Sequence, residues 1–274
     1  MATLEEKVEI GVDGGQISGT FITPGTLVPG VLLVHGWGGS QQQYVMRARD
    51  IAALGCVCLT FDLRGHALTR SLYFETVTRE QNMQDVLAAY DTLAARQHID
   101  PNAIAVVGSS YGGYLAAILT SMRPVKWLGL RAPALYIDTG WDSPKLQLHK
   151  EQDLKGYRNS FVPAEANRAL RAVQQFGGDL LLVQSELDDL IPQTVLTSYR
   201  EAGKHARSLT YRCMDGADHG LTKDTDQAAY KTLLVNWLSE MVFGARGPQG
   251  HEPPVAAPPE PALPERPPRT QGSA

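Results

Sequence analysis

A serine between a predicted strand and a predicted helix has the surroundings of a residue that does covalent chemistry. Ser110 lies at the centre of the pentapeptide Gly108–Gly112, which has the pattern Gly-x-Ser-x-Gly. The apolar run 103–107 precedes it, and the run 114–119 that follows is typical of a helix. Glycines on both sides leave room for a sharp turn that exposes the serine oxygen. The pattern can arise by chance in a chain with 26 glycines, so its context carries the prediction that Ser110 is a nucleophile.

A glycine-rich loop, His35–Ser40, follows another predicted strand. Acyl transfer places negative charge on the substrate's carbonyl oxygen, and backbone N–H groups aimed at that oxygen lower the barrier by about 3–4 kcal/mol each. We expect the N–H groups of Trp37 and Tyr111 to form this oxyanion hole. His35 is expected to brace the loop rather than to take part in the chemistry.

A carboxylate follows a later strand. Asp188 comes after the apolar run 179–184 and just before a helix that opens near Pro192. The carboxyl ends of parallel strands meet at one edge of a sheet, which places Asp188 near Ser110. The alternative is that Asp188 or Asp189 only caps the helix.

A histidine follows the last predicted strand. His219 lies in a glycine-flanked loop, where a histidine is often merely solvated or capping. Here the chain order Ser, Asp, His matches that of a widespread hydrolase fold. We therefore predict a catalytic triad in which His219 is the base and Asp188 orients its ring.

These residues depend on an alternation of strands and helices along the chain. Short Val-, Leu-, Ile- and Ala-rich runs predict buried strands, and helical spacing of apolar residues marks the segments between them. The fold class is therefore α/β, with a mostly parallel, doubly wound sheet. Residues 6–23 alternate polar and apolar positions around a turn, which predicts an antiparallel hairpin at the start. The predicted strands are 31–35, 56–61, 103–108, 126–131, 179–184 and 208–213, and the predicted helices are 41–54, 79–97, 111–122, 164–175, 192–202 and 225–242.

One catalytic domain is expected over residues 1–243, followed by a tail over 244–274. The tail is rich in proline and poor in aliphatic residues, so we expect it to be disordered. Within the domain, residues 133–163 are expected to form a small cap over the site. Two of its aromatic residues, Tyr136 and Trp141, are expected to line the substrate pocket.

Composition excludes several classes of function. The formal net charge is -4 and no run is dense in lysine or arginine, which argues against nucleic acid as a partner. Neither a signal peptide nor an apolar run of about 18 residues is visible, so we expect a cytoplasmic protein without a membrane partner. No Cys/His cluster or dinucleotide fingerprint is present, so no metal or cofactor is expected. The three cysteines, Cys56, Cys58 and Cys213, are expected to be reduced and buried.

From about residue 6 to residue 243, the chain resembles the α/β-hydrolase superfamily. The hairpin and the His35–Ser40 loop resemble the small feruloyl-esterase, dienelactone-hydrolase and S33-peptidase-like branches. Asp62–His66 resembles their Asp-x-Arg-Gly-His turn, which is structural in such relatives, but Ala67 stands where many of them have glycine. Ser110–Gly113 resembles the nucleophile turn of prolyl-oligopeptidase-type peptidases. A serine nucleophile, in place of the cysteine of true dienelactone hydrolases, argues against that particular activity.

The resemblance implies a serine hydrolase, and we expect its substrate to be a small carboxylic ester with a short or aryl-containing acyl group. A peptidase or amidase is the alternative, because the same triad cleaves both kinds of bond. A catalytically silent binding scaffold is a second alternative. The sequence makes no prediction of the oligomeric state.

Overall fold

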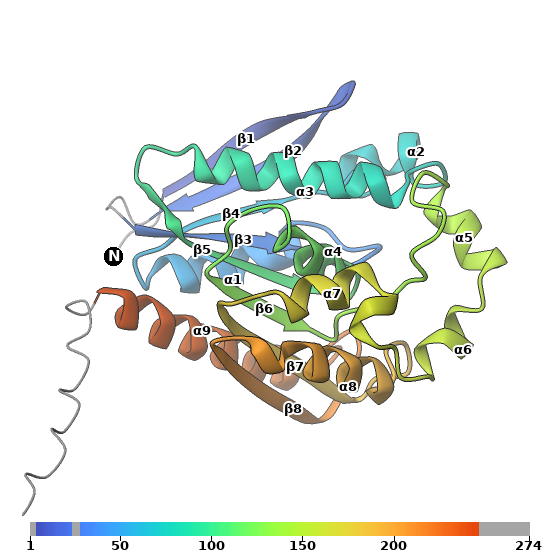
Figure 1. Ribbon diagram of the computed structural model, residues 1–274. Helices are drawn as coiled ribbons and strands as arrows, with labels where there is room; N and C mark the ends of the chain where they lie inside the picture. Colours follow the sequence, from blue (N-terminus) through green and yellow to red (C-terminus); the bar gives the residue numbers. More distant parts are fainter. Residues whose placement is uncertain (1–3, 24–27, 247–274) are drawn as a thin grey trace, which may run out of the picture.

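One eight-stranded sheet forms the centre of the computed structural model, which describes residues 4–23 and 28–246 (Figure 1). The strand order is β1-β2-β4-β3-β5-β6-β7-β8. Strands β3 to β8 are parallel, whereas β1 and β2 form an antiparallel hairpin that joins β4. The predicted α/β fold with an N-terminal hairpin is confirmed. The strands are β1 (Leu4–Val12), β2 (Gly15–Thr23), β3 (Val28–Val34), β4 (Val57–Phe61), β5 (Ile99–Ser109), β6 (Trp127–Arg131), β7 (Asp179–Leu187) and β8 (Ser208–Asp218).

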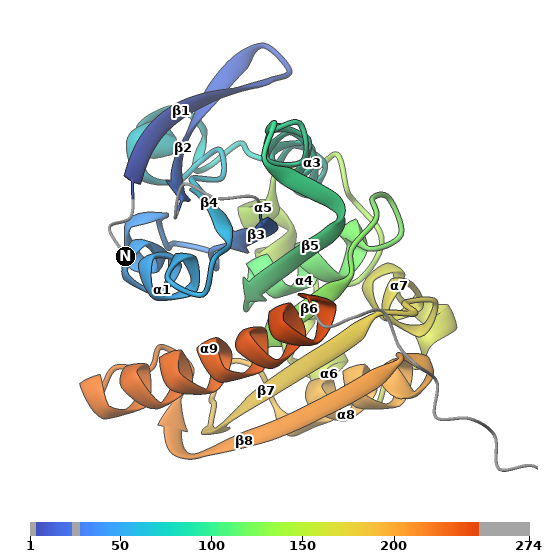
Figure 2. The same cartoon turned by 90° about the vertical axis from the view of Figure 1, so that its left-hand side faces the viewer.

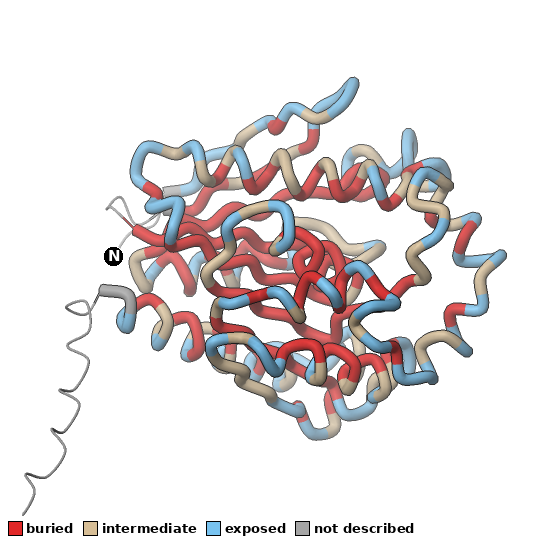
Figure 3. The backbone as a smooth tube through the Cα atoms, viewed as in Figure 1, coloured by how far each residue is buried: buried red, intermediate tan, exposed pale blue. Residues whose placement is uncertain are grey.

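The helices cover both faces of the sheet. Helices α1 and α9 pack together on one face, and α3, α4, α7 and α8 lie on the other (Figure 2). Because both faces are covered, every residue of β3, β4 and β6 is buried, as their continuous apolar runs predict (Figure 3). The helices that cover the sheet are α1 (Gln42–Ala52), α3 (Arg79–Ala94), α4 (Tyr111–Leu119), α7 (Arg168–Gln174), α8 (Gln193–Ala202) and α9 (Asp224–Arg246).

The segment 133–163, predicted as a small cap, contains two helices that the sequence pattern does not indicate. These are α5 (Lys145–Glu151) and α6 (Leu154–Arg158), which project beyond the end of the sheet, α5 on the side of α2 (Arg70–Tyr73) and α6 on the side of α8 (Figure 1). Such short helices are defined by tertiary contacts rather than by a long apolar stripe. Short 3₁₀ turns occupy Ala67–Thr69, Ala164–Ala166 and Gly203–His205.

The end of α9 differs from the predicted boundary between domain and tail. The helix continues to Arg246, past the predicted start of the tail at residue 244. The predicted boundary rests on composition, but the first proline beyond the helix is Pro248, so the backbone can remain helical for longer. The rest of the predicted tail lies outside the described residues.

Two further expectations concern the chain as a whole. Within residues 4–23 and 28–246, no helix is long and apolar enough to cross a membrane. Cys56 and Cys58 are buried as expected, but Cys213 is exposed, which corrects the prediction for that thiol. Cys213 lies on β8, which is the last strand in the sheet order and has partly open faces.

Candidate active site

Ser110 occupies the sharp turn between β5 and α4. Its backbone has φ 53° and ψ -119°, a strained conformation for a residue other than glycine. The neighbouring glycines are required sterically. A Cβ atom on Gly108 would lie 2.4 Å from the carbonyl oxygen of Gly112, and one on Gly112 would lie 2.3 Å from that of Val34. The turn is therefore closed to larger residues at both positions, and it holds Ser110 at the carboxyl end of the sheet.

His219 links Ser110 to Asp188. Its Nε2 lies 3.0 Å from Ser110 Oγ, and its Nδ1 lies 2.7 Å from Asp188 Oδ2. With the proton on Nδ1, the ring donates to Asp188 and accepts from Ser110. The Asp188 side chain is only 2% exposed, and its Oδ1 accepts the N–H groups of Leu190 and Ile191. This network fixes both the carboxylate and the ring that it contacts.

The other nearby carboxylates have different partners. Asp218, adjacent to His219 in the chain, accepts the backbone N–H of Thr222 at 2.9 Å. Glu186 accepts the N–H of Gly216 at 2.6 Å, and Asp189 is exposed. Neither Asp188 nor Asp189 caps α8, because Pro192 is the N-cap and no side chain accepts a hydrogen bond there. Asp188 instead stabilises the turn before the helix, through the oxygen that His219 leaves unoccupied.

The backbone N–H groups of Trp37 and Tyr111 come from the two segments that flank Ser110. Tyr111 is the first residue of α4, so its N–H has no acceptor within the helix and carries the positive end of the helix dipole. Trp37 lies in the loop after β3 and lines the same cavity as Ser110. A Cβ atom on Gly36 would lie 3.4 Å from Ser110 Cβ, which shows how closely the loop approaches the serine. Both groups are suited to bind a developing oxyanion.

His35 is held inside the protein beneath this loop. Its Nε2 accepts the backbone N–H of Leu63 at 3.0 Å, and its ring lies 5.0 Å from that of His66. Burial lowers the pKa of each histidine to about 4. Both rings are therefore neutral at pH 7, and His35 connects the loop to the Asp62–His66 turn.

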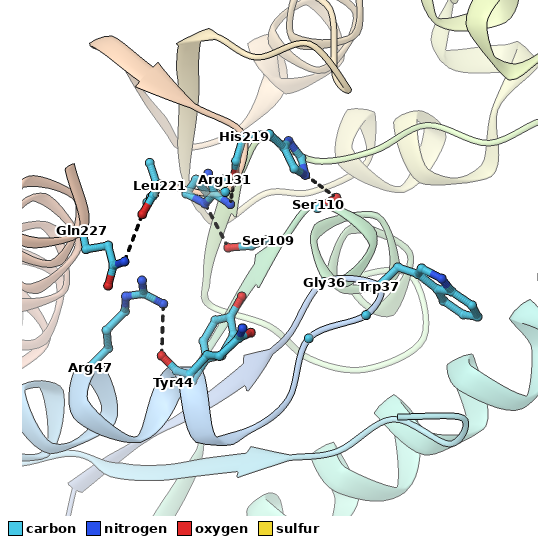
Figure 4. A pocket seen from close by; sticks show the side chains of 14 residues that line it. Gly36, Trp37, Tyr44, Arg47, Ser109, Ser110, Arg131, His219, Leu221 and Gln227 are labelled. Atoms are coloured by element: carbon cyan, nitrogen blue, oxygen red, sulfur yellow. Dashed lines mark hydrogen bonds between the residues drawn. The ribbon is translucent and has the colours of Figure 1, made fainter. Parts of the chain in front are cut away.

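The cavity that opens beside Ser110 has a volume of about 360 Å³ (Figure 4). Neither Tyr136 nor Trp141, the two residues expected to line the substrate pocket, contributes to its wall. Tyr136 is buried with its ring 5.6 Å from that of Tyr111, and Trp141 lines a separate hollow beside α3. Both point into the packing between the cap and the helices beneath it, because the cap folds back onto α3 and α4.

Three basic side chains around the cavity and the loop after β3 were not found from the sequence. Arg47, on α1, and Arg131, at the end of β6, line the cavity (Figure 4). Lys145, from the cap, is buried with its ammonium group 3.8 Å from the centre of the Trp37 ring. Burial lowers the pKa of Lys145, and Tyr136 opposes that shift. An arginine that ends an otherwise apolar buried strand is a signal that could have identified Arg131.

No cluster of His, Cys, Asp or Glu able to hold a metal ion occurs among the residues that the structure describes. The chemistry proposed for the site uses its own side chains and backbone groups. Ser110 can lose its proton to His219 while it attacks, Asp188 can stabilise the resulting imidazolium, and the two N–H groups can bind the oxyanion.

Solved structures of other proteins share the fold of this chain. Its fold is similar to that of dienelactone hydrolase from Anabaena variabilis (TM-score 0.60, 18% identity, 86% of this chain and 97% of that one). It is also similar to an esterase from Pyrococcus furiosus (TM-score 0.65, 20% identity, 88% and 94%). An acylaminoacyl peptidase from Pyrococcus horikoshii matches with TM-score 0.66 and 15% identity over 88% of this chain but only 42% of that one. No curated protein matches the sequence.

The sequence itself matches a family model. Residues 39–244, which include Ser110, Asp188 and His219, match the model of the prolyl oligopeptidase family. This match covers most of the chain and agrees with the resemblance of the turn at Ser110 to the peptidases of that group. The chain therefore belongs to the prolyl oligopeptidase family, and it is a hydrolase with the α/β-hydrolase fold.

Proposed function

We propose that the protein hydrolyses carboxylic esters with short or aryl-containing acyl groups, through Ser110, His219 and Asp188. The observation that carries the proposal is the position of the His219 ring. Its Nε2 is 3.0 Å from Ser110 Oγ while its Nδ1 is 2.7 Å from Asp188, so one ring contacts both the nucleophile and the carboxylate.

The reaction begins when Ser110 Oγ attacks the ester carbonyl carbon and its proton passes to His219 Nε2. The N–H groups of Trp37 and Tyr111 hold the oxyanion of the tetrahedral intermediate. The bond to the alcohol oxygen then breaks, and the imidazolium gives its proton to the leaving oxygen. Water attacks the acyl-enzyme as His219 takes its proton, and the proton returns to Ser110 Oγ when the acid leaves.

The size of the site supports a small substrate. The cavity beside Ser110 has a volume of about 360 Å³, which lies at the lower end of the range for small-molecule sites. Tyr44 supplies aromatic surface to its wall, which suits an aryl group. The cap helices α5 and α6 have seven and five residues, unlike the long apolar lid that a lipid-surface enzyme would use.

A peptidase is the second candidate. The family match and the similarity to an acylaminoacyl peptidase both favour it. The proposed machinery would cleave an amide by the same steps, with the amine as leaving group. A catalytically silent scaffold is a further alternative, although a strained serine that contacts a histidine at the edge of a cavity has little value in a binding protein.

One panel of substrates separates these candidates. We expect kcat/KM for 4-nitrophenyl esters to be highest for acetate, butyrate or benzoate and to fall steeply toward palmitate. Aminoacyl 4-nitroanilides should be cleaved more slowly than the best ester, and the Ser110→Ala variant should lose at least ~10³ in kcat on every substrate. An anilide that outperforms all the esters would make the protein a peptidase. An absence of turnover throughout would indicate the scaffold.

An organophosphonate probe tests the choice of nucleophile directly. Two adjacent serines lie in the turn, but Ser109 is buried and its Oγ accepts a hydrogen bond from Arg131. We expect peptide mapping to find the adduct on Ser110, because only Ser110 contacts His219. An adduct on Ser109 would contradict the assignment.

A further inference from the structure

Arg131 is a buried arginine without a carboxylate partner in the described part of the chain. The residue is 7% exposed, and its guanidinium group donates hydrogen bonds to uncharged oxygen atoms. These are Ser109 Oγ at 3.3 Å, Ser185 Oγ at 3.4 Å and the carbonyl oxygen of His219 at 2.9 Å. A guanidinium carries more N–H donors than these bonds use. A buried charge is normally paired, so the positive charge of Arg131 lacks its usual compensation.

Arg47 brings a second positive charge to the same place from the other side of the cavity. Its guanidinium is 5.3 Å from the centre of the Tyr230 ring, and that of Arg131 is 5.7 Å from the same ring. Burial raises the pKa of Tyr230, and both arginines oppose that shift. The Arg47 side chain donates to the carbonyl oxygen of Gln43, in its own helix, at 3.5 Å. Among the ion pairs of residues 4–23 and 28–246, neither arginine takes part.

The cavity between the two arginines also contains the reacting groups. Ser110 and His219 line it together with Arg47 and Arg131, and the described side chains of its wall include no Asp or Glu (Figure 4). The remaining polar groups are the amides of Gln43 and Gln227 and the glycine-rich backbone of the loop after β3. Two cations without a balancing anion give this space a positive potential beside the nucleophile.

We propose that this cavity recognises a substrate that carries a carboxylate, which Arg47 and Arg131 bind while Ser110 attacks the ester bond. Guanidinium groups match the planar geometry of a carboxylate and remain charged at all physiological pH values. The inference rests on the proposed hydrolase function and narrows its substrate class to acidic esters. The carboxylate compensates the charge that the protein leaves unpaired at Arg131.

Substitution of Arg47, rather than of Arg131, can distinguish anion binding from a structural role. Arg131 holds the carbonyl group of His219, so any change at Arg131 also disturbs the base. Arg47 donates within its own helix and has no contact with Ser110, His219 or Asp188 among the hydrogen bonds of the described residues. Arg49, two residues further along α1, is a matched control because it is exposed and pairs with Glu5 outside the cavity.

The first test compares esters that differ only in one charge. The first pair is 4-acetoxybenzoate with its methyl ester, which places the carboxylate on the alcohol half. The second pair is mono-4-nitrophenyl terephthalate with its methyl ester, which places the carboxylate on the acyl half. We expect the native protein to prefer the anionic member of at least one pair by about tenfold or more in kcat/KM. Arg47→Gln should reduce that preference by about tenfold, mainly through KM, and Arg47→Lys should restore part of it. Arg49→Gln changes the net charge equally and should leave the preference intact.

The second test measures binding without turnover, so that it does not depend on the proposed function. Calorimetry with the Ser110→Ala variant should detect benzoate but not benzamide, and Arg47→Gln in that background should weaken benzoate binding by about tenfold. If benzoate binds through Arg47 but no ester is cleaved, the subsite stands and the proposed function fails. If esters are cleaved without an anionic preference and benzoate does not bind, the carboxylate subsite is wrong. An equal loss of preference in the Arg47 and Arg49 variants would also overturn it, because it would show an effect of net charge alone.

Discussion

The carboxyl edge of the sheet and the cap are held together in different ways. At the edge, Ser110, Asp188 and His219 each lie within a few residues of the end of a strand, and backbone groups fix their loops. The cap contributes no strand to the sheet, and it is attached by side chains from distant elements and by a few backbone hydrogen bonds, such as that from Lys145 to Val77. Arg79 of α3, for example, donates to the carbonyl oxygens of Ile137 and Thr139.

The difference between the two regions explains what each can contribute. A strand end restrained by backbone hydrogen bonds and glycines holds a reacting atom in one position, which catalysis requires. A cap that lies outside the sheet, attached by a few buried side chains and isolated backbone hydrogen bonds, can vary in sequence without disturbing that position. We therefore expect changes at the edge to act on kcat with little effect on folding, and changes at the cap attachment to act on stability first.

The largest effect expected after loss of the nucleophile is that of Asp188→Asn. An asparagine keeps the shape of the side chain but cannot stabilise the imidazolium or hold the same tautomer, so kcat should fall by about 10³-fold or more. Asp218→Asn is the matched control, because Asp218 is the neighbour of His219 in the chain but contacts Thr222 instead. A severe loss of kcat confined to Asp218→Asn would mean that the wrong carboxylate has been assigned.

Acid should destabilise the edge through the two buried histidines. His35 and His66 have pKa values of about 4 in the folded protein because burial disfavours their charged forms, whereas an unfolded histidine titrates near 6.5. Their contribution to stability is complete above about pH 6.5 and is lost as the pH falls toward 4, since the unfolded chain binds protons first. Melting temperatures measured from pH 7.5 to 4.5 should show this decrease.

Substitution of the histidines tests the origin of that pH dependence. The His35→Gln and His66→Gln variants should each have a flatter profile of melting temperature over the same range, whatever their stability at pH 7. His98→Gln removes an exposed histidine and should leave the slope unchanged. Equal slopes in all four proteins would show that other groups cause the acid sensitivity.

Arg79→Lys should weaken the attachment of the cap. Arg79 is 1% exposed, and both ends of its guanidinium donate to cap carbonyl groups, which a lysine cannot reproduce. Hydrogen bonds from a charged donor contribute about 1.5–3 kcal/mol each, so we expect the free energy of unfolding to fall by about 2–3 kcal/mol. Urea unfolding measures the loss, and limited proteolysis should find new cleavage within 133–163. The same pattern in Arg123→Lys, whose ion pair is on the surface, would exclude a specific role for Arg79.

The same contrast separates what sequence could predict from what it could not. The turn at Ser110 and the loops that contain Asp188 and His219 are local patterns, so the residue types and their spacing are sufficient to propose them. Arg47 and Lys145 acquire their positions only when α1 and the cap pack around the site, and no local pattern marks them. Helices α5 and α6 escaped prediction for a related reason, because they have too few residues to show a periodic apolar face.

The smallest expected effect concerns Ala67, where the chain departs from the glycine of many relatives. Ala67 has φ 44°, a left-handed conformation that costs an alanine about 1–2 kcal/mol relative to glycine. A glycine at this position would remove that cost, but it would also make the unfolded chain more flexible, which offsets part of the stabilisation. Ala67→Gly should therefore stabilise the protein by only about 0.5–1 kcal/mol. The residue is exposed, so the change leaves no cavity in the core.

The control for this prediction is Ala229→Gly, at an exposed position within α9. Its effect should have the opposite sign, a destabilisation of about 1 kcal/mol. Urea unfolding of the two variants gives both values, and a destabilised Ala67→Gly variant would show that the turn at the end of Asp62–His66 gains more from the alanine side chain than it loses in strain.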